Sequence, residues 1–331
     1  MQASSEEIAS DHPTRETASS ASLVVPGRNV ERTLTRCLDS AAPLLASRLL
    51  TEIIYVDDGS SDASSRLARE AGATCLEAGG LGPGGARNVG WRAAATDLVW
   101  FVDADCVIEP GTLEKLLGEL TAPEVGGVGG SYSNAVADSL LARLIHAEIR
   151  ERHLRATAGG TVAGDVDYLG SFNVLYRRAL LDEVGGFDES WVNGPGAPGA
   201  EDADLSYRIA ALGRRLRLRA DARVAHHHPV SLGSYLRAQR LHGFWGVRLY
   251  RRHPARGRKN SYSGALDHLQ PPLALATLAG LVLLIRVPGA AWLVAALALL
   301  LVASTVPMSL RLVARRGAER LLFAPLAVLR R

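Results

Sequence analysis

The feature that most limits the possible folds is an alternation of short apolar segments with helix-like segments. Residues 23–25 form an apolar run that ends at Pro26, and residues 53–56 form a second one. Between these runs, apolar residues recur at the three- and four-residue spacing of a helix. A third strand is expected at 98–102. Strands that alternate with helices in this way predict an α/β domain with a mostly parallel, Rossmann-like sheet.

A pair of carboxylates follows two of these predicted strands. Asp57 and Asp58 come directly after the second strand, and Asp103 and Asp105 come directly after the third. Because the carboxyl ends of the strands in such a sheet open into one crevice, we expect these side chains to share one site. Carboxylates at a strand end suit Mg²⁺ or Mn²⁺, with substrate phosphates completing the coordination shell. A solvated or tight turn is the alternative for either pair.

A glycine-rich segment, residues 79–85, precedes a predicted helix that carries Arg87. Free amide groups at the start of a helix favour an anion, and a guanidinium group can hold phosphate oxygens. The segment lacks the Lys-Ser/Thr ending of a P-loop, and no G-x-G-x-x-G sequence opens the first helix. Arg87 is therefore a candidate phosphate ligand, in a protein that is neither a P-loop NTPase nor a typical dinucleotide-dependent dehydrogenase.

Two nearly charge-free segments lie near the C-terminus, at about 269–285 and 288–306. At 1.5 Å per residue they reach about 26 and 29 Å, which is enough to cross a bilayer. Arginines precede and follow the pair, so both flanks are expected to be cytoplasmic. Before them, apolar residues and arginines alternate over 230–260, as in a helix that lies on a membrane surface. A buried helical hairpin of a soluble protein is the alternative for the two segments.

The rest of the composition limits which cellular compartment and which binding partners are expected. Residues 1–20 are rich in Ser, Glu, Asp and Thr and have no apolar core, which predicts a disordered tail and no secretory signal. The formal net charge is only +3, so no nucleic-acid partner is expected. Cys37, Cys75 and Cys106 have no C-x-x-C spacing, so neither a disulfide framework nor a zinc site is predicted. A reducing cytoplasm fits this cysteine usage.

Taken in order, the motifs resemble those of glycosyltransferase family 2, whose members have the GT-A fold. The similarity extends from about residue 22 to residue 228. The segments that carry it are Val25-Pro26, Asp57-Asp58-Gly59-Ser60, Ala86-Arg87-Asn88-x-Gly90, Asp103-x-Asp105, Arg177-Arg178, Gly185-Gly186-Phe187-Asp188-Glu189 and Glu201-Asp202. Each segment alone is common, whereas seven in this order are specific. The resemblance implies a nucleotide-diphosphosugar donor, a divalent cation and inversion at the anomeric carbon.

The resemblance also implies roles in donor binding and catalysis. It implies that Asp58 lies near the nucleobase, that Arg87 lies near the diphosphate and that Asp202 takes the proton of the acceptor hydroxyl. An acidic pair favoured by a helix dipole is the alternative for Glu201 and Asp202. The glycine- and proline-rich segment 194–199 is a candidate lid. The donor-binding candidates are Pro26, Asn29, Asp57, Asp58, Arg87, Asn88 and Asp103, and the catalytic candidates are Asp202 and Glu201.

The metal site implied by the resemblance combines carboxylates with a histidine. Asp105 is implied as the chief ligand, with Asp103 in support. His226 is the preferred third ligand and His228 the second choice, because members of the family often carry a histidine after the last strand of the domain. A histidine at this position can also cap a strand or pack on an aromatic ring.

The sequence thus predicts a GT-A catalytic domain at 21–229, an amphipathic interfacial helix at 230–260 and a helical membrane anchor at 261–331. The predicted function is transfer of one sugar to a lipid-linked or envelope-glycan acceptor at the cytoplasmic face of the inner (plasma) membrane. Residues 239–245 only approximate the Q-x-x-R-W signature of processive synthases, which favours a single transfer. Two alternatives stay open: a sugar nucleotidyltransferase, and a non-catalytic nucleotide-binding membrane protein.

Overall fold

The computed structural model describes residues 20–135, 138–157, 161–192, 199–256 and 260–316. The predicted tail, except for its last residue, lies outside the described residues, and so does the predicted lid apart from Gly199.

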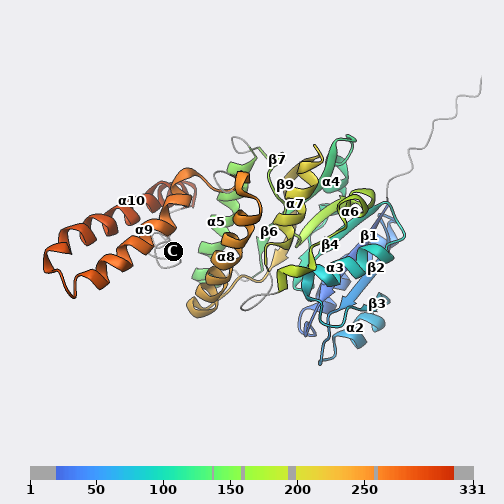
Figure 1. Ribbon diagram of the computed structural model, residues 1–331. Coiled ribbons are helices and arrows are strands. Elements are labelled where there is room, and N and C mark those ends of the chain that lie inside the picture. The colour runs from blue at the N-terminus through green and yellow to red at the C-terminus, as the bar shows by residue number, and fades with distance from the viewer. Residues whose placement is uncertain (1–19, 136–137, 158–160, 193–198, 257–259, 317–331) are drawn as a thin grey trace, which may run out of the picture.

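The described strands join into one sheet at the centre of the larger part of the molecule (Figure 1). The strands are β1 Ala21–Gly27, β2 Leu50–Asp57, β3 Thr74–Glu77, β4 Leu98–Val102, β5 Cys106–Ile108, β6 Val125–Asn134, β7 Ala163–Val166, β8 Asn173–Arg177 and β9 Arg215–His226. Their order across the sheet is β3-β2-β1-β4-β8-β6-β9-β5, and β7 pairs with β9.

The sheet is parallel in its first half and mixed in its second. β3, β2, β1 and β4 run parallel, as the alternation of strands and helices predicts. β8 is antiparallel to both β4 and β6, and β5 and β7 are antiparallel to β9. The predicted α/β class is confirmed, but the antiparallel strands were not predicted. β5, β7 and β8 are three to five residues long, and such short runs carry too little periodicity to define a strand.

Helices cover both faces of the sheet because alternate strand residues point to opposite sides. Leu23 and Val25 of β1 belong to the core beneath α1, α2 and α4, whereas Val24 belongs to the core beneath α3, α6 and α7. The helices are α1 Leu34–Ala46, α2 Ser64–Glu70, α3 Gly82–Ala93, α4 Thr112–Glu119, α5 Leu140–Ala156, α6 Arg178–Val184, α7 Glu201–Ala211, α8 Leu232–Arg252, α9 Ala265–Leu283 and α10 Ala291–Arg316.

A close helix–strand contact sets the position of α3 and therefore of Arg87. A Cβ atom added to Gly90 would lie 2.3 Å from Cγ1 of Val24 on β1, so that only glycine allows this approach. Pro83 sits at the first turn of α3, where its missing N–H has no intrahelical partner to lose. The helix is thereby fixed against β1 with its first turns at the carboxyl edge of the sheet.

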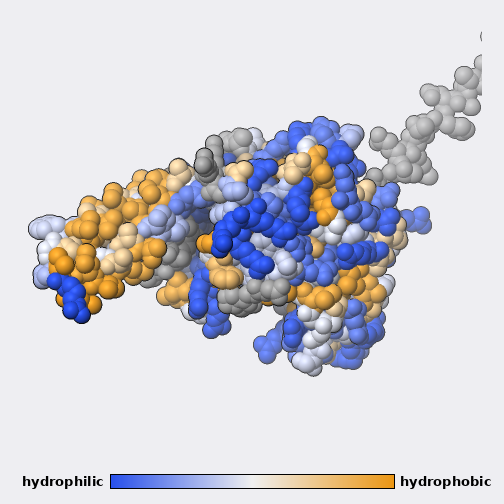
Figure 2. All heavy atoms as spheres, in the orientation of Figure 1, coloured by the Kyte–Doolittle hydropathy of each residue, from blue (hydrophilic) through white to orange (hydrophobic). Residues whose placement is uncertain are grey.

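The helices α9 and α10 form a hairpin that projects from the sheet domain (Figure 1). Both are long and apolar enough to cross a membrane by length and composition alone. Their outer side chains are exposed, for example Leu275 at 69%, Trp292 at 85% and Leu299 at 70%, and hydrophobic residues dominate the visible surface of the hairpin (Figure 2). α9 begins four residues before the predicted segment 269–285 and ends two residues before its end. α10 begins three residues after the start of the predicted segment 288–306 and continues ten residues past its end.

The base of the hairpin is fastened to α5. Met308 and Leu312 of α10 pack against Leu144 of α5 in a small core that also contains Tyr235 of α8. Arg152 of α5, which is largely buried, donates to a carboxylate oxygen of Asp267 in the first turn of α9 at 3.0 Å. The same guanidinium group lies 2.8 Å from Glu148 and also donates to the carbonyl oxygen of Tyr262 at 3.0 Å.

Candidate active site

A cleft with a volume of about 820 Å³ opens at the carboxyl ends of β1, β2 and β4. Seven of the predicted site residues line it, whereas four others lie beside it. The lining residues among the candidates are Pro26, Asp58, Arg87, Asp103, Asp105, Glu201 and Asp202, and the four beside it are Asn29, Asp57, Asn88 and His226. The fold therefore brings together donor, metal and catalytic candidates that lie up to 176 positions apart, from Pro26 to Asp202.

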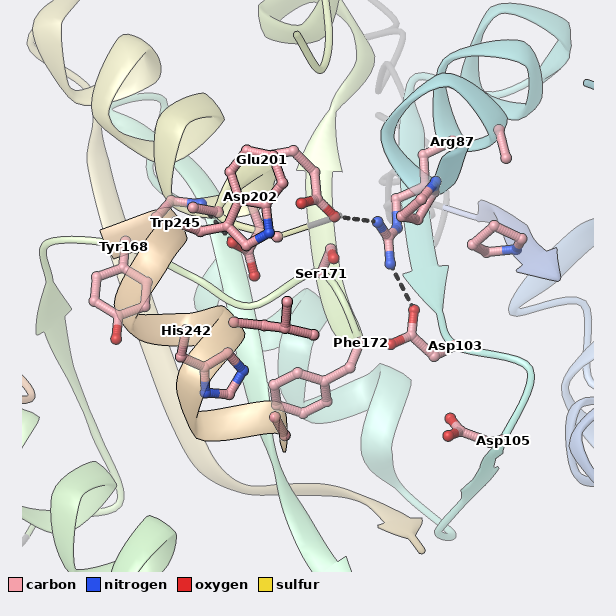
Figure 3. A pocket seen from close by; sticks show the side chains of 18 of the residues that line it. Arg87, Asp103, Asp105, Tyr168, Ser171, Phe172, Glu201, Asp202, His242 and Trp245 are labelled. Carbon is pink, nitrogen blue, oxygen red and sulfur yellow. Dashed lines mark hydrogen bonds and ion pairs between the residues drawn. The ribbon is translucent and has the colours of Figure 1, made fainter. Parts of the chain in front are cut away.

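Arg87 connects the two acidic groups of the cleft (Figure 3). Its guanidinium group donates to Asp103 Oδ1 at 2.7 Å and to Glu201 Oε1 at 3.0 Å. The side chain is buried, so both ion pairs are shielded from solvent. Burial opposes the charge of Arg87, but Asp103 and Glu201 together raise its pKa. Arg87 Nε and Glu201 Oε2 are buried without a partner among the described residues, which leaves polar atoms for a ligand.

Asp202 lies in the first turn of α7, where the helix dipole favours negative charge. Its Oδ1 accepts a hydrogen bond from the backbone N–H of Ala203 at 2.7 Å. Burial raises the pKa of Asp202. Burial also raises the pKa of Glu201, and the negative charge of Asp202 adds to this effect. A carboxylate with a raised pKa is a stronger proton acceptor than a solvated one, which suits a general base.

Asp105 and His226 face each other at the end of the cleft. Their Oδ2 and Nε2 atoms are 3.4 Å apart, because β5 pairs with β9 directly after Asp105. Burial opposes ionisation, but the hydrogen bond and charge of His226 lower the pKa of Asp105. His226 Nδ1 is buried without a partner among the described residues. Carboxylate oxygen and imidazole nitrogen form a donor set that fits Mn²⁺ or Mg²⁺.

The other two metal candidates are placed differently. Asp103 forms an ion pair with Arg87 and is not free beside Asp105. A cation would therefore compete with the guanidinium group of Arg87 for the carboxylate of Asp103. His228 is buried, and burial followed by the charge of His226 lowers its pKa to about 3. Within the described residues, no three His, Cys, Asp or Glu side chains converge on one point. A cation at Asp105 would therefore need ligands from a substrate such as a diphosphate.

Asp58 occupies the start of α3. Its Oδ2 accepts a hydrogen bond from the backbone N–H of Gly82 at 3.0 Å, so a side-chain carboxylate takes the place expected for a phosphate. Burial raises the pKa of Asp58, against the opposing effect of the backbone hydrogen bonds. Asp58 Oδ1 is buried and has no partner among the described residues. This oxygen can accept a hydrogen bond from a nucleobase N–H or a ribose hydroxyl.

Two candidates on neighbouring loops hold those loops together. Asp57 accepts hydrogen bonds from the backbone N–H of Ser60 at 2.7 Å and from the hydroxyl of Ser65, which closes the turn after β2. Asn29 Oδ1 accepts from the backbone N–H of Ser61 at 2.8 Å and so links the loops that follow β1 and β2. Neither side chain lines the cleft. The contacts of Asp57 are those of the turn that the sequence offered as an alternative.

Asn88 fills all of its hydrogen-bonding positions with protein groups. Its amide nitrogen donates to Phe187 O and to Glu189 Oε1, each at 2.8 Å. Its amide oxygen accepts from Phe187 N at 2.8 Å and from Trp91 Nε1 at 2.9 Å. Asn88 therefore ties α3 to the segment before α7 and positions the helix that carries Arg87.

Asn88→Ala is expected to destabilise the protein by about 2–4 kcal/mol, because it leaves buried N–H and C=O groups without partners. Thermal unfolding of the detergent-purified protein would measure this loss. Arg92→Ala, on the exposed face of the same helix, is the control and should change stability by less than about 1 kcal/mol. Loss of nucleotide-sugar affinity without loss of stability would instead assign Asn88 to the donor site.

The cleft also contains residues that the motifs did not indicate. They lie on the loop before β8, on α7 and on α8, namely Tyr168, Phe172, Tyr207, Leu241, His242 and Trp245. The sequence pattern over 230–260 predicts a helix on a membrane surface. That prediction does not identify the inward face of α8, which lines the cleft. The spacing of Ala238, Leu241, His242, Trp245 and Leu249 does follow one helical face and is the signal that could have identified this wall.

An acidic pair follows a central strand of the α/β sheet and faces the acidic start of a helix across one cleft. This arrangement defines a catalytic domain of the GT-A class. The family model described as "Glycosyl transferase family 2" matches residues 22–185. The chain belongs to this family.

The relatives agree with this assignment. The chain is 32% identical over 242 residues to the pre-mycofactocin glycosyltransferase of Mycobacterium tuberculosis, covering 70% of this chain and 48% of that protein. It is 30% identical over 171 residues to the putative glycosyltransferase EpsH of Bacillus subtilis, covering 49% and 48%. The chain thus spans about half the length of the curated relatives it matches.

Solved structures of lower similarity include glucosyl-3-phosphoglycerate synthase from Mycobacterium tuberculosis in complex with Mn²⁺ and UDP-glucose. That protein is 22% identical to this chain, with a TM-score of 0.46, over 70% of this chain and 79% of the other.

Proposed function

We propose that the protein transfers one sugar from a nucleotide-diphosphosugar to an acceptor hydroxyl, with inversion at the anomeric carbon. The observation that carries this proposal is the composition of one cleft. Arg87 and Asp105 lie toward one side, where they suit a diphosphate, and Asp202 lies across the cleft from Asp105 (Figure 3). Asp58, which suits the nucleotide, lines the same cleft. A single displacement needs groups on both sides of the reacting carbon, and this cleft supplies them.

In the proposed reaction the acceptor oxygen attacks the anomeric carbon from the side of Asp202. Asp202 takes the hydroxyl proton, the new glycosidic bond forms, and the bond to the nucleoside diphosphate breaks. Asp105 and His226 would hold a divalent cation, with Asp103 beside them, and that cation would neutralise charge on the leaving diphosphate. Burial raises the pKa of Asp202 and the negative charge of Asp103 adds to this effect, whereas the charge of Arg87 opposes it.

A screen of nucleotide sugars tests the proposal. The detergent-purified chain is incubated with UDP-, GDP- and TDP-sugars, with and without Mn²⁺ or Mg²⁺, and release of nucleoside diphosphate is measured. We expect cation-dependent release from one donor class. Formation of a nucleotide sugar from a nucleoside triphosphate, with release of pyrophosphate, would identify a nucleotidyltransferase instead. Donor binding without any release would identify a non-catalytic binder.

We further propose that α9 and α10 anchor the protein in the inner (plasma) membrane, with the cleft on the cytoplasmic side and a lipid-linked or envelope-glycan acceptor. The exposed apolar surface of the hairpin supports this, because soluble proteins rarely leave so large an apolar surface exposed. Arg286 lies in the short connection, and arginines of α8 precede the pair. The excess of arginines before the hairpin supports the cytoplasmic orientation.

The membrane proposal predicts that lysines introduced into α9 and α10 release the protein from the membrane. Leu278→Lys combined with Leu299→Lys is expected to move the protein from the carbonate-resistant membrane fraction to the soluble fraction. Each charge costs about 2.5–3.5 kcal/mol at the centre of a membrane helix. Leu212→Lys, on the exposed surface of the sheet domain, is the matched control and should stay in the membrane fraction. A double variant that remains resistant would show that the hairpin does not span the bilayer.

A further inference from the structure

The cleft extends beyond the residues assigned to the donor. Beyond Asp202, on the side away from Arg87, its wall is formed by the loop before β8, by α7 and by the inward face of α8 (Figure 3). This wall consists mainly of rings and apolar side chains, namely Tyr168, Tyr207, Leu241, Trp245, Leu249 and Tyr250. In the proposed function an acceptor would approach Asp202 from this side while a donor fills the other half.

The cations nearest to this wall are engaged elsewhere. Arg248 lies over the rings of Trp191 and Trp245, at 5.3 and 5.4 Å from their centroids. Arg252 forms an ion pair with Asp204 at 3.3 Å. No arginine of α8 lines the cleft, and all of α8 belongs to the described part of the chain. A phosphate that entered this half would therefore meet no guanidinium group of α8.

The charges between the two halves of the cleft also disfavour the binding of an anion. Glu201 and Asp202 stand where the two halves of the cleft meet, and the positive charge of Arg87 is already shared between Glu201 and Asp103. Like charges in a site with little solvent repel strongly. His242 is the only residue of α8 lining the cleft that can become cationic, and its imidazole can equally serve as a hydrogen-bonding group.

We propose that this half binds an uncharged sugar ring whose hydroxyl is the nucleophile, rather than a phosphate or a simple lipid alcohol. The inference rests on the proposed function and names its acceptor class. The negative faces of aromatic rings accept the C–H face of a sugar, and tyrosine and imidazole groups can bond its hydroxyls. A lipid chain needs only aliphatic contacts, whereas this wall has four aromatic rings and two leucines.

A matched pair of ligands tests the charge requirement without relying on turnover. Binding of phenyl β-glucoside, its 6-phosphate and dioctanoylglycerol to the full chain is measured by isothermal titration calorimetry. We expect the neutral glucoside to bind at least about tenfold more tightly than either of the others, a difference of about 1.4 kcal/mol. Tighter binding of the phosphate or of dioctanoylglycerol would overturn the inference. If the glucoside binds but no nucleotide sugar is cleaved, the transferase proposal and the role of the sugar as acceptor fail, while the binding of an uncharged sugar ring to this wall stands.

A pair of variants locates the binding on this wall. Leu241→Arg puts a cation inside the cleft, whereas Val247→Arg puts one on the outer face of α8, where Val247 is 63% exposed. We expect Leu241→Arg to reverse the preference toward the 6-phosphate and Val247→Arg to leave the preference unchanged. If Leu241→Arg does not fold, His242→Arg places the cation on an exposed side chain of the same wall, with the same expected reversal. An unchanged preference in the folded cleft variant would overturn the inference.

Discussion

Asp202→Asn is expected to lower kcat by about 10²- to 10⁴-fold with little change in donor affinity, because asparagine keeps the size of the side chain but cannot take a proton. Donor contacts are assigned to Asp58, Arg87 and Asp105, which this substitution leaves in place. Steady-state kinetics with the donor found by the nucleotide-sugar screen would give kcat. Isothermal titration calorimetry with the same donor would give its affinity separately.

Two neighbouring carboxylates serve as comparisons for this experiment. If turnover of Asp202→Asn stayed near wild type, the base would be another group, and Glu201 would be tested first as Glu201→Gln. Asp204, the next acidic residue of α7, is fully buried and pairs with Arg208 at 2.9 Å and with His253 at 2.8 Å. Asp204→Asn should therefore lower stability rather than act specifically on kcat. Loss of donor binding in Asp202→Asn would move Asp202 to the donor site.

Asp105→Ala is expected to lower turnover by roughly 10³-fold or more, since a cation that stabilises the leaving group contributes several kcal/mol. Donor affinity should also lose its dependence on Mn²⁺, because the carboxylate proposed to hold the cation is gone. Calorimetric titration of the donor with and without Mn²⁺ measures this dependence. Asp97→Ala, at the exposed opposite end of β4, is the matched control. Donor affinity that still rises with Mn²⁺ in Asp105→Ala would contradict the assignment.

The parallel half of the sheet could be predicted because its signals are local. The run Leu23-Val24-Val25 lies within β1 and belongs to two cores on opposite faces, as its uninterrupted apolar character indicates, although the strand continues through Pro26 to Gly27. Asp103 and Asp105 could be placed at the mouth of the sheet for the same reason. The antiparallel β8 could not, because it pairs with strands that lie far from it in the sequence.

The contacts inside the site depend on distant partners, which local patterns do not report. Arg87 was expected to face a phosphate, yet its nearest acceptors are Asp103 and Glu201, the latter 114 residues away. The sequence predicts an external anion at the start of α3, but Asp58 from the loop after β2 occupies this position. The inward face of α8 could not be predicted, because a helix has the same alternation of arginines and apolar residues whether its apolar face contacts lipid or lines a cleft.

The ion pairs of Arg152 with Glu148 and Asp267 have a mechanical consequence. The pair with Asp267 joins the first turn of α9 to α5, and Glu148, on α5 itself, holds the guanidinium group in place. Breaking a largely buried ion pair costs about 3–5 kcal/mol, so this joint resists bending. In the proposed membrane-bound state, the catalytic centre would be carried at a fixed height and tilt above the bilayer. Such a joint would fix the distance between the membrane surface and the catalytic centre. A membrane-attached acceptor would be modified only at the sugar whose distance from its lipid matches that height, whereas a longer or shorter chain would present the wrong residue.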